Sequence, residues 1–130
     1  MKAIIQRVSG ATVKIHNQNS RTISKGLVIL LGVGIKDTSE DIEILANKIL
    51  NLRIFPDRDK MDLSIQDVMG DLLIISQFTL YADCTKGNRP SFLHAAKPVH
   101  AKKIYDEFVN YMHNQNLIVK TGIFGEHMEV

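Results

Sequence analysis

The sequence predicts a single α/β domain of 130 residues, built on a mixed or antiparallel β-sheet, or a barrel-like sheet, with two main helices. Short apolar runs bounded by glycine or polar residues indicate strands. Two longer segments repeat apolar residues at helical spacing. The predicted order is ββ, β, α, ββ, α, β, in which helices do not alternate with strands regularly enough for a doubly wound fold.

Four strands are expected in the first third of the chain. Residues 3–8 and 12–15 have the composition of strands, and Gly10 lies in the turn between them, where it can adopt a positive φ. A short strand is expected over residues 21–23. The run 27–33 is apolar on both faces, as is typical of a strand that is buried on both sides.

The first helix is predicted over residues 37–53. Asp37 or Thr38 can cap its start, and an acidic residue follows three positions later at Glu40 or Asp41, as in a capping box. One face of this helix carries an apolar stripe made of Ile42, Leu45, Ala46, Ile49 and Leu52 or Arg53.

The segment between the helices is expected to contain two turns and two strands. Composition predicts a turn over 55–59, a short strand within 62–68, a turn over 69–71 and a long strand over 72–80. Residues 81–96 then have the composition of a loop. A loop of this length inside a compact domain is usually functional.

The second helix is expected to begin at Pro98, because proline suits the first helical position. It ends at residues 114–116, which are Asn-Gln-Asn, and a short strand over 117–119 follows. A turn over 121–125 leads to a last strand that starts at Met128. The buried stripe of this helix is expected to consist of Ala101, Ile104, Tyr105, Phe108 and Met112.

Composition and charge exclude several classes of protein. Hydrophobic residues make up 45% of the chain, so disorder is not expected, and the net charge of +2 permits an RNA partner without demanding one. The N-terminus is too short and polar for a signal peptide, and the longest apolar run is far shorter than a membrane span. The single cysteine, Cys84, cannot form an internal disulfide and fits a reducing compartment. We therefore predict a cytoplasmic protein.

No metal or cofactor site is predicted. The histidines form no i, i+4 helical pair and no Cys/His cluster with ligand spacing. Only His94, near the long loop, is of interest, and a solvated loop histidine is the simpler interpretation. Gly32-Val33-Gly34 resembles a phosphate-binding loop, but it lacks the third glycine and the Gly-Lys-Ser/Thr sequence. The five histidines are His16, His94, His100, His113 and His127.

Chemistry is most plausibly located where polar residues end the strand 72–80. The segment Ser76-Gln77-Phe78-Thr79-Leu80 faces a basic loop that contains Lys86 and Arg89, which would suit a polar substrate. Alternatively, the two hydroxyl groups bond only to backbone as the strand leaves the core. Thr79 is a candidate nucleophile without a neighbouring base, and Cys84, in a polar loop close to Lys86, is another.

These segments together resemble the D-aminoacyl-tRNA deacylase family, once called D-tyrosyl-tRNA deacylases. The resemblance covers the whole chain, and its two strongest motifs are Ser76-Gln77-Phe78-Thr79-Leu80 and Gly87-Asn88-Arg89-Pro90-Ser91-Phe92. The other matches are Ile5-Gln6-Arg7-Val8, Leu30-Leu31-Gly32-Val33, Leu52-Arg53-Ile54-Phe55, Lys120-Thr121-Gly122-Ile123-Phe124-Gly125 and His127-Met128.

The resemblance implies a substrate, an assembly and a set of site residues. The substrate would be the 3′-terminal adenosine of tRNA carrying a D-amino acid, or glycine on the wrong tRNA. The enzyme would be a homodimer with its active sites near the dimer interface, and it would use neither metal nor cofactor. The implied catalytic residues are Gln77, Phe78 and Thr79, and the implied substrate-binding residues are Ser76, Arg7, Arg89, Pro90, Ser91, Phe92, Phe124 and Met128.

The resemblance also implies a mechanism. Backbone amides near Gln77, Phe78 and Thr79 would hold the carbonyl oxygen as negative charge develops. The terminal 2′-hydroxyl of the tRNA itself would assist hydrolysis, and the protein would mainly position the ester. This mechanism explains why no base is found beside Thr79, which would then orient the substrate.

The chain departs from the family pattern at its C-terminal end. The family continues into a segment with the sequence Asn-Asp-Gly-Pro-Val-Thr, which enters the partner's pocket and excludes L-amino acids, and the arginine matching Arg7 helps to hold it. This sequence stops at Val130. We expect a truncation rather than a natural short form, and weak chiral discrimination or low activity for the 130 residues alone.

Two other functions remain open from the sequence. A non-catalytic RNA-binding module would retain the fold and bind tRNA without turnover. A small-molecule hydrolase that uses Cys84 would be inactivated by a thiol-blocking reagent.

Overall fold

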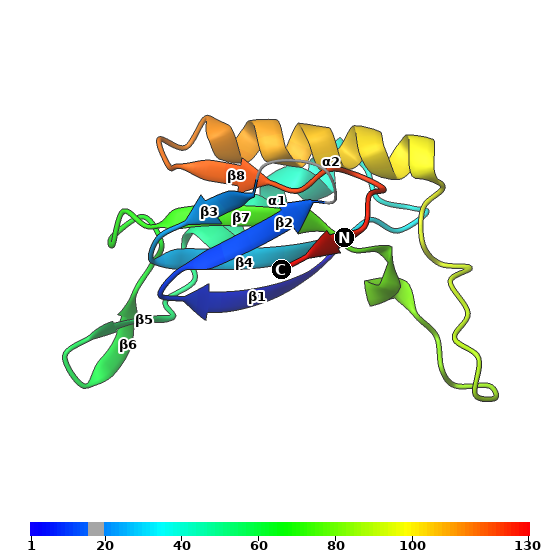
Figure 1. The fold of residues 1–130 in the computed structure, drawn as a ribbon, viewed down its shortest axis with the longest axis horizontal. Helices are drawn as coiled ribbons and strands as arrows, with labels where there is room; N and C mark the ends of the chain where they lie inside the picture. The colour runs from blue at the N-terminus through cyan, green and yellow to red at the C-terminus, as the bar shows by residue number, and fades with distance from the viewer. Residues whose placement is uncertain (16–19) are drawn as a thin grey trace.

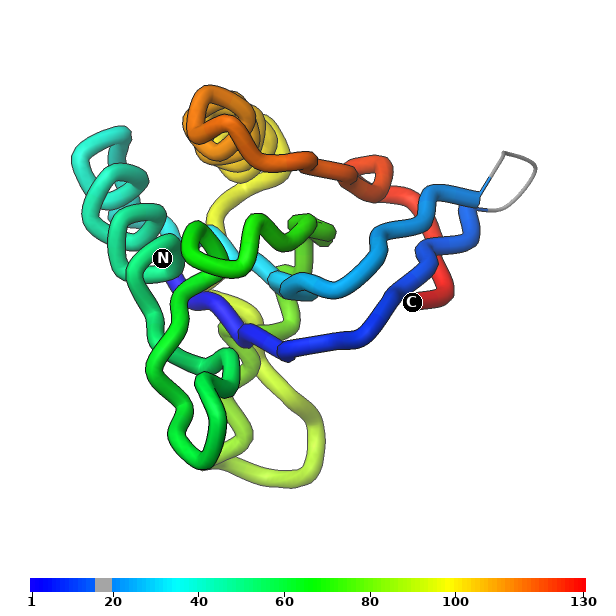
Figure 2. Tube along the Cα trace, turned by 90° about the vertical axis from the view of Figure 1, so that its left-hand side faces the viewer, coloured from blue at the N-terminus to red at the C-terminus, as the bar shows by residue number. Residues whose placement is uncertain are grey.

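The computed structural model describes residues 1–15 and 20–130, which form three layers (Figures 1 and 2). The middle layer is a sheet with the strand order β1-β4-β7-β8. The first strand runs antiparallel to its neighbour, and the other three run parallel to one another, which confirms the prediction of a mixed sheet. The strands are β1 (Lys2–Val8), β4 (Gly26–Gly32), β7 (Asp71–Ser76) and β8 (Val119–Thr121).

Two helices, α1 (Ser39–Leu50) and α2 (Pro98–His113), cover one face of this sheet (Figure 1). Each lies in the connection between two parallel strands, because parallel neighbours need a long crossover. The buried face of α2 consists of the five predicted residues, among which Phe108 and Met112 are fully buried. The periodicity of the sequence therefore locates the helical face that packs on the sheet.

A second sheet covers the opposite face (Figure 2). It has the order β3-β2-β9 and is antiparallel, with the strands β3 (Arg21–Ile23), β2 (Ala11–Ile15) and β9 (Met128–Glu129). In β4, Leu27 and Ile29 pack in the core under the helices, whereas Val28 packs with the second sheet. The run 27–33 is apolar on both faces because both faces are covered, as predicted.

The start of α1 follows the predicted capping pattern in part. The Thr38 N–H donates to Asp41 Oδ2 at 2.8 Å, so Thr38 precedes the helix and Asp41 satisfies its backbone. Asp37 instead bonds to other parts of the chain. The helix stops at Leu50, three residues before the predicted end. There the side-chain amide of Asn51 donates to the carbonyl oxygen of Asn47 at 2.8 Å.

The segment after α1 differs from the prediction. The expected turn at 55–59 belongs to a hairpin of β5 (Phe55–Asp57) and β6 (Lys60–Leu63), and Arg58 makes the reversal with a φ of 52°. The strand expected within 62–68 ends at Leu63. The following residues turn because the Asp67 carboxylate accepts from the Ser64 N–H and hydroxyl at 2.8 and 2.7 Å, which competes with extended pairing.

The long strand predicted over 72–80 is also wrong in its second half. Strand β7 ends at Ser76, opposite Leu31, and the last ladder bond runs from the Gln77 N–H to the carbonyl oxygen of Leu31 at 2.8 Å. The neighbouring β4 ends one residue later, so the chain has no strand left to pair with. It turns instead into the short 3₁₀ helix η1 (Phe78–Tyr81).

Two further points concern the described part of the chain. None of its helices is long and apolar enough to cross a membrane. His16, one of the histidines considered above, lies outside the described residues.

Candidate active site

The candidate site lies where the parallel strands β4 and β7 end. Both carboxyl ends reach the same edge of the sheet, which is the usual position of a ligand site in a sheet of this kind. Polar residues occur there because the chain leaves the core after Ile75. Ser76 and Gln77 are half-buried at this edge, and η1 continues outward from them.

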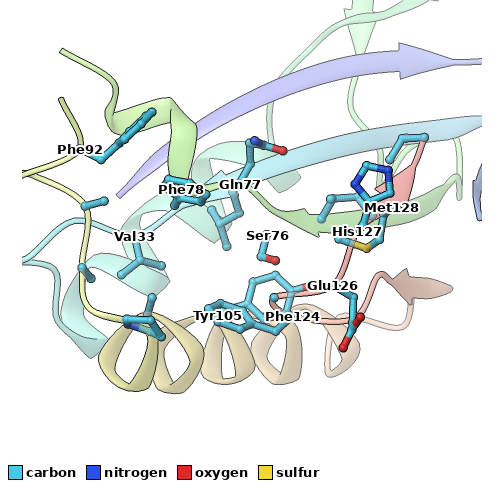
Figure 3. Close-up of a pocket in the computed structure, with 18 residues that line it drawn as sticks. Val33, Ser76, Gln77, Phe78, Phe92, Tyr105, Phe124, Glu126, His127 and Met128 are labelled. Carbon is cyan, nitrogen blue, oxygen red and sulfur yellow. The ribbon is translucent and has the colours of Figure 1, made fainter. Parts of the chain in front are cut away.

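A cavity of about 690 Å³ opens beside these residues (Figure 3). Its walls come from the strand ends, the loop before α2, the first turns of α2 and the chain that leads into β9. Six of the predicted site residues line it, namely Ser76, Gln77, Phe78, Phe92, Phe124 and Met128. The sequence motifs at 76–80, 87–92 and 120–128 therefore meet at one cavity.

Four aromatic side chains line the cavity in two pairs. Phe78 and Phe92 meet edge to face with their ring centroids 5.0 Å apart, and 58% of Phe78 is exposed. On the opposite wall Tyr105 and Phe124 lie 5.8 Å apart (Figure 3). The buried Tyr105 hydroxyl donates to the carbonyl oxygen of Ile74 at 2.8 Å, and burial raises its pKa, so it stays protonated. It supports the wall and is not a free acid or base.

The backbone amides at the start of η1 are the groups that the sequence predicted to hold a carbonyl oxygen. The Gln77 amide is already bonded to the carbonyl oxygen of Leu31. Phe78 and Thr79 come first in η1, where N–H groups have no acceptor within the helix itself. The Thr79 hydroxyl is exposed and accepts from the Gln77 side-chain amide at 2.5 Å. Thr79 does not line the cavity, although its neighbours do.

The remaining predicted site residues lie outside the cavity. Arg7 projects from β1 and donates to the carbonyl oxygen of Ile54 at 2.5 Å. Arg89 and Pro90 are exposed in the long loop, and Ser91 exchanges backbone hydrogen bonds with Asp83 at 2.8 and 2.9 Å. That bridge closes the loop into a hairpin-like projection beside the cavity wall formed by Phe92.

Two polar cavity residues, Glu126 and His127, were not among the predicted site residues. Both are exposed and precede β9, close to Met128 (Figure 3). The Ile123 N–H donates to Met128 Sδ at 3.3 Å, which closes the turn that carries them. His127 belongs to a motif used for the family resemblance, and this was the one sequence signal that pointed to it.

Other candidate groups lie apart from the cavity. Cys84 is an exposed free thiol in the long loop and does not line it. His94 lines a second, smaller cavity with Asp37 and Tyr81. Among residues 1–15 and 20–130, no group of three or more His, Cys, Asp or Glu side chains is arranged to hold a metal ion.

A family model described as D-Tyr-tRNA(Tyr) deacylase matches residues 4–130. The chain belongs to this deacylase family. A D-aminoacyl-tRNA deacylase of Thermosipho africanus is 56% identical over 131 residues, which cover 100% of this chain and 88% of that protein. A D-aminoacyl-tRNA deacylase of Clostridium perfringens is 49% identical with the same coverage. The predicted family and the predicted class, a hydrolase, are confirmed.

Two solved structures have a similar fold. A c-Myc DNA Unwinding Element Binding Protein has a TM-score of 0.92 at 34% identity, and the match covers 99% of this chain and 89% of that chain. A probable eukaryotic D-amino acid tRNA deacylase has a TM-score of 0.82 at 16% identity, covering 98% and 90%, a likeness of fold alone. The predicted fold class is confirmed.

Proposed function

We propose that this deacylase-family chain hydrolyses the ester between a D-amino acid and the 3′-terminal adenosine of tRNA. The single observation that carries the proposal, given the family, is the largely apolar cavity at the ends of β4 and β7, which Phe78 at the start of η1 lines. A concave apolar site with few convergent polar groups suits a small substrate moiety. The volume of about 690 Å³ is ample for an aminoacyl group together with part of the nucleoside.

The backbone amides of Phe78 and Thr79 stabilise the developing oxyanion in this proposal. The Gln77 amide, also expected in this role from the sequence, is engaged by the sheet at 2.8 Å, which leaves the next two amides for the substrate. Fixed backbone donors cost no reorganisation during the reaction, and each is worth about 3–4 kcal/mol in a water-poor site.

The attacking water is activated by the substrate's own 2′-hydroxyl rather than by a side chain. Thr79 is poorly suited as a nucleophile because its hydroxyl oxygen already accepts from the side-chain amide of Gln77 at 2.5 Å. An amide donor cannot remove the hydroxyl proton, as an activating base must. Thr79 therefore orients the substrate, and positioning supplies a large part of the rate.

Glycine on the wrong tRNA is a second substrate in this proposal, since it has no side chain to be excluded. Selection against L-amino acids works by steric rejection. The family resemblance attributes this rejection to a Gly-Pro segment that is not among the 130 residues. The ratio of D to L hydrolysis measures this selection.

The proposal includes a homodimer that acts in the cytoplasm. The edge strand β1 carries the half-exposed Ile4, and Val130 beside the cavity is 62% exposed. A second copy would cover such apolar edge surface. Light scattering of the purified chain at several concentrations tests the dimer, and a monomer at all of them contradicts it.

The decisive experiment compares D-tyrosyl-tRNA, L-tyrosyl-tRNA and glycyl-tRNA as substrates. We expect hydrolysis of the D ester and of the glycyl ester, and much slower hydrolysis of the L ester. Binding of tRNA without turnover would favour the non-catalytic RNA-binding alternative. Hydrolysis of the L ester as fast as that of the D ester would contradict the proposed rejection of L-amino acids.

A second experiment tests the mechanism through Thr79→Ala and a tRNA that ends in 2′-deoxyadenosine. We expect Thr79→Ala to retain appreciable turnover and the 2′-deoxy substrate to react far more slowly. The matched control is Thr22→Ala, which removes a comparable exposed hydrogen bond to Thr12 (2.9 Å). Loss of all turnover in Thr79→Ala, with normal tRNA binding, would restore Thr79 as the nucleophile.

A further inference from the structure

The Gly32-Val33-Gly34 segment, which is not a phosphate loop, has a different use in the structure. A Cβ atom on Gly32 would lie 3.0 Å from the carbonyl oxygen of Gln77 and 3.1 Å from Leu80 Cβ. A Cβ atom on Gly34 would lie 2.7 Å from the hydroxyl oxygen of Tyr81, and the next two atoms also belong to that ring. The two glycines therefore let η1 lie directly on the end of β4.

Tyr81 is held in this position by Asp37. Its hydroxyl donates to Asp37 Oδ2 at 3.1 Å. The same carboxylate accepts from the Gly34 N–H at 2.6 Å and from the Met1 ammonium at 2.7 Å. Burial opposes ionisation of Asp37, but these hydrogen bonds and the ammonium charge outweigh it and lower its pKa, so it remains an acceptor. Burial and the Asp37 charge raise the pKa of Tyr81 to about 12, so it remains a donor.

Lys2 holds the same end of η1 from another side. Its ammonium donates to the carbonyl oxygen of Leu80 at 3.2 Å and lies 4.6 Å from the centroid of the Tyr81 ring. The His100 ring in α2 contacts the backbone oxygen of Asp37 at 2.9 Å. The contacts of Asp37, Tyr81 and Lys2 thus join η1 to β1, to the chain after β4 and to α2.

These contacts lie away from the substrate cavity. Asp37, Gly34 and Tyr81 line the second cavity, whose lining has no residue in common with the larger one. The first residue of η1, Phe78, faces the larger cavity (Figure 3). The contacts of Asp37 with Tyr81 therefore act on the last residue of η1, whereas the proposed reaction uses the amides of the first two.

We propose that Gly32, Gly34, Asp37 and Tyr81 form a seat that fixes η1, so that Tyr81 is a positioning residue for deacylation. The inference rests on the proposed use of the Phe78 and Thr79 amides. Because η1 is a single short turn, movement of its Tyr81 end shifts the amides at its other end. Small displacements of that kind are costly when the substrate itself supplies the hydroxyl and the protein supplies geometry.

The test is Tyr81→Phe, which removes the bond to Asp37 and leaves the ring on Gly34. We expect kcat to fall roughly tenfold with KM for D-tyrosyl-tRNA nearly unchanged, since a misplacement of about 1 Å can cost up to about 100-fold. The matched control is Tyr111→Phe, which removes a hydroxyl bond to Asn47 Oδ1 (3.2 Å) between the two helices. Tyr111→Phe should have the kcat and KM of the wild type.

Amide hydrogen exchange of the peptide 77–82 supplies a readout that does not depend on activity. The Leu80 and Ala82 amides bond to Gln77 and Thr79 within this turn, so their exchange reports its stability. We expect these amides to exchange faster in Tyr81→Phe and at the wild-type rate in Tyr111→Phe. Unchanged exchange overturns the seat. If the wild type is active, and Tyr81→Phe exchanges faster but keeps the wild-type kcat, the positioning role is overturned.

Gly34→Ala perturbs the seat from its other side. The new methyl group would displace the Tyr81 ring, so this variant should reproduce the exchange and kcat changes of Tyr81→Phe. Wild-type behaviour of Gly34→Ala contradicts the proposal. Failure of the wild type itself to hydrolyse D-tyrosyl-tRNA would refute the proposed function, while the exchange data would still decide whether Tyr81 fixes η1.

Discussion

Replacing Asp37 by asparagine should destabilise the fold far more than its position in a surface loop suggests. The Asp37 side chain is 13% exposed and that of Met1 is 1% exposed, with 2.7 Å between the ammonium nitrogen and Oδ1. Asparagine keeps an oxygen for the Gly34 N–H but leaves the ammonium without a counter-charge. Breaking a buried pair costs about 3–5 kcal/mol, and an exposed pair at most about 1 kcal/mol. For this mostly buried pair we expect a loss of about 2–4 kcal/mol.

Urea unfolding of the wild type, Asp37→Asn and Asp62→Asn measures this loss. Asp62 pairs with Arg53 at 3.0 Å, but their side chains are 55% and 69% exposed, so its replacement should cost at most about 1 kcal/mol. Equal midpoint shifts for the two variants, at equal m-values, would refute the reasoning from burial.

The pH dependence gives a second check on the same pair. The pKa of Asp37 is lowered from its ordinary value of 3.8, so its contribution is fully present above that value and is lost as the pH falls through the folded-state pKa. Asparagine does not titrate. The stability gap between the wild type and Asp37→Asn should therefore be constant near neutral pH and close in strong acid. A gap that widens below pH 3.8 would contradict this assignment.

Two further changes separate structural from chemical roles. Tyr105→Phe removes the buried bond to the carbonyl oxygen of Ile74, and urea unfolding should show a loss of about 1–2 kcal/mol; no loss would mean that water replaces the hydroxyl. Cys84→Ser should leave deacylation unchanged, and a thiol-blocking reagent should not inhibit the wild type, because Cys84 lies outside the cavity lining. Inhibition by the reagent, absent in Cys84→Ser, would support the thiol-dependent alternative.

Local patterns in the sequence were sufficient to predict which faces of a helix or strand are buried. The stripe of α2 follows from helical spacing, and the two-sided burial of β4 follows from its unbroken apolar run. The motifs at 76–80 and 87–92 carried the family. These features repeat within a few residues, so they can be read without knowing which distant segment lies opposite.

The limits of elements were less predictable because they depend on partners elsewhere in the chain. Strand β7 was expected to reach Leu80, yet it ends at Ser76 because β4, its partner, ends at Gly32. The hairpin of β5 and β6 was taken for a turn because its strands are short and mostly exposed. Pairing across sequence distance decided both cases.

The candidate site shows the same division. By itself the sequence determined the fold class, the family and the Ser-Gln-Phe-Thr motif, since these rest on residue identity and local period. Only the tertiary structure decided that Phe78 and Phe124 face one cavity, that Glu126 and His127 join them, and that Arg7 lies elsewhere. The physical reason is that a cavity wall is assembled from segments far apart in the chain, and their meeting is fixed by sheet register and packing rather than by any local pattern.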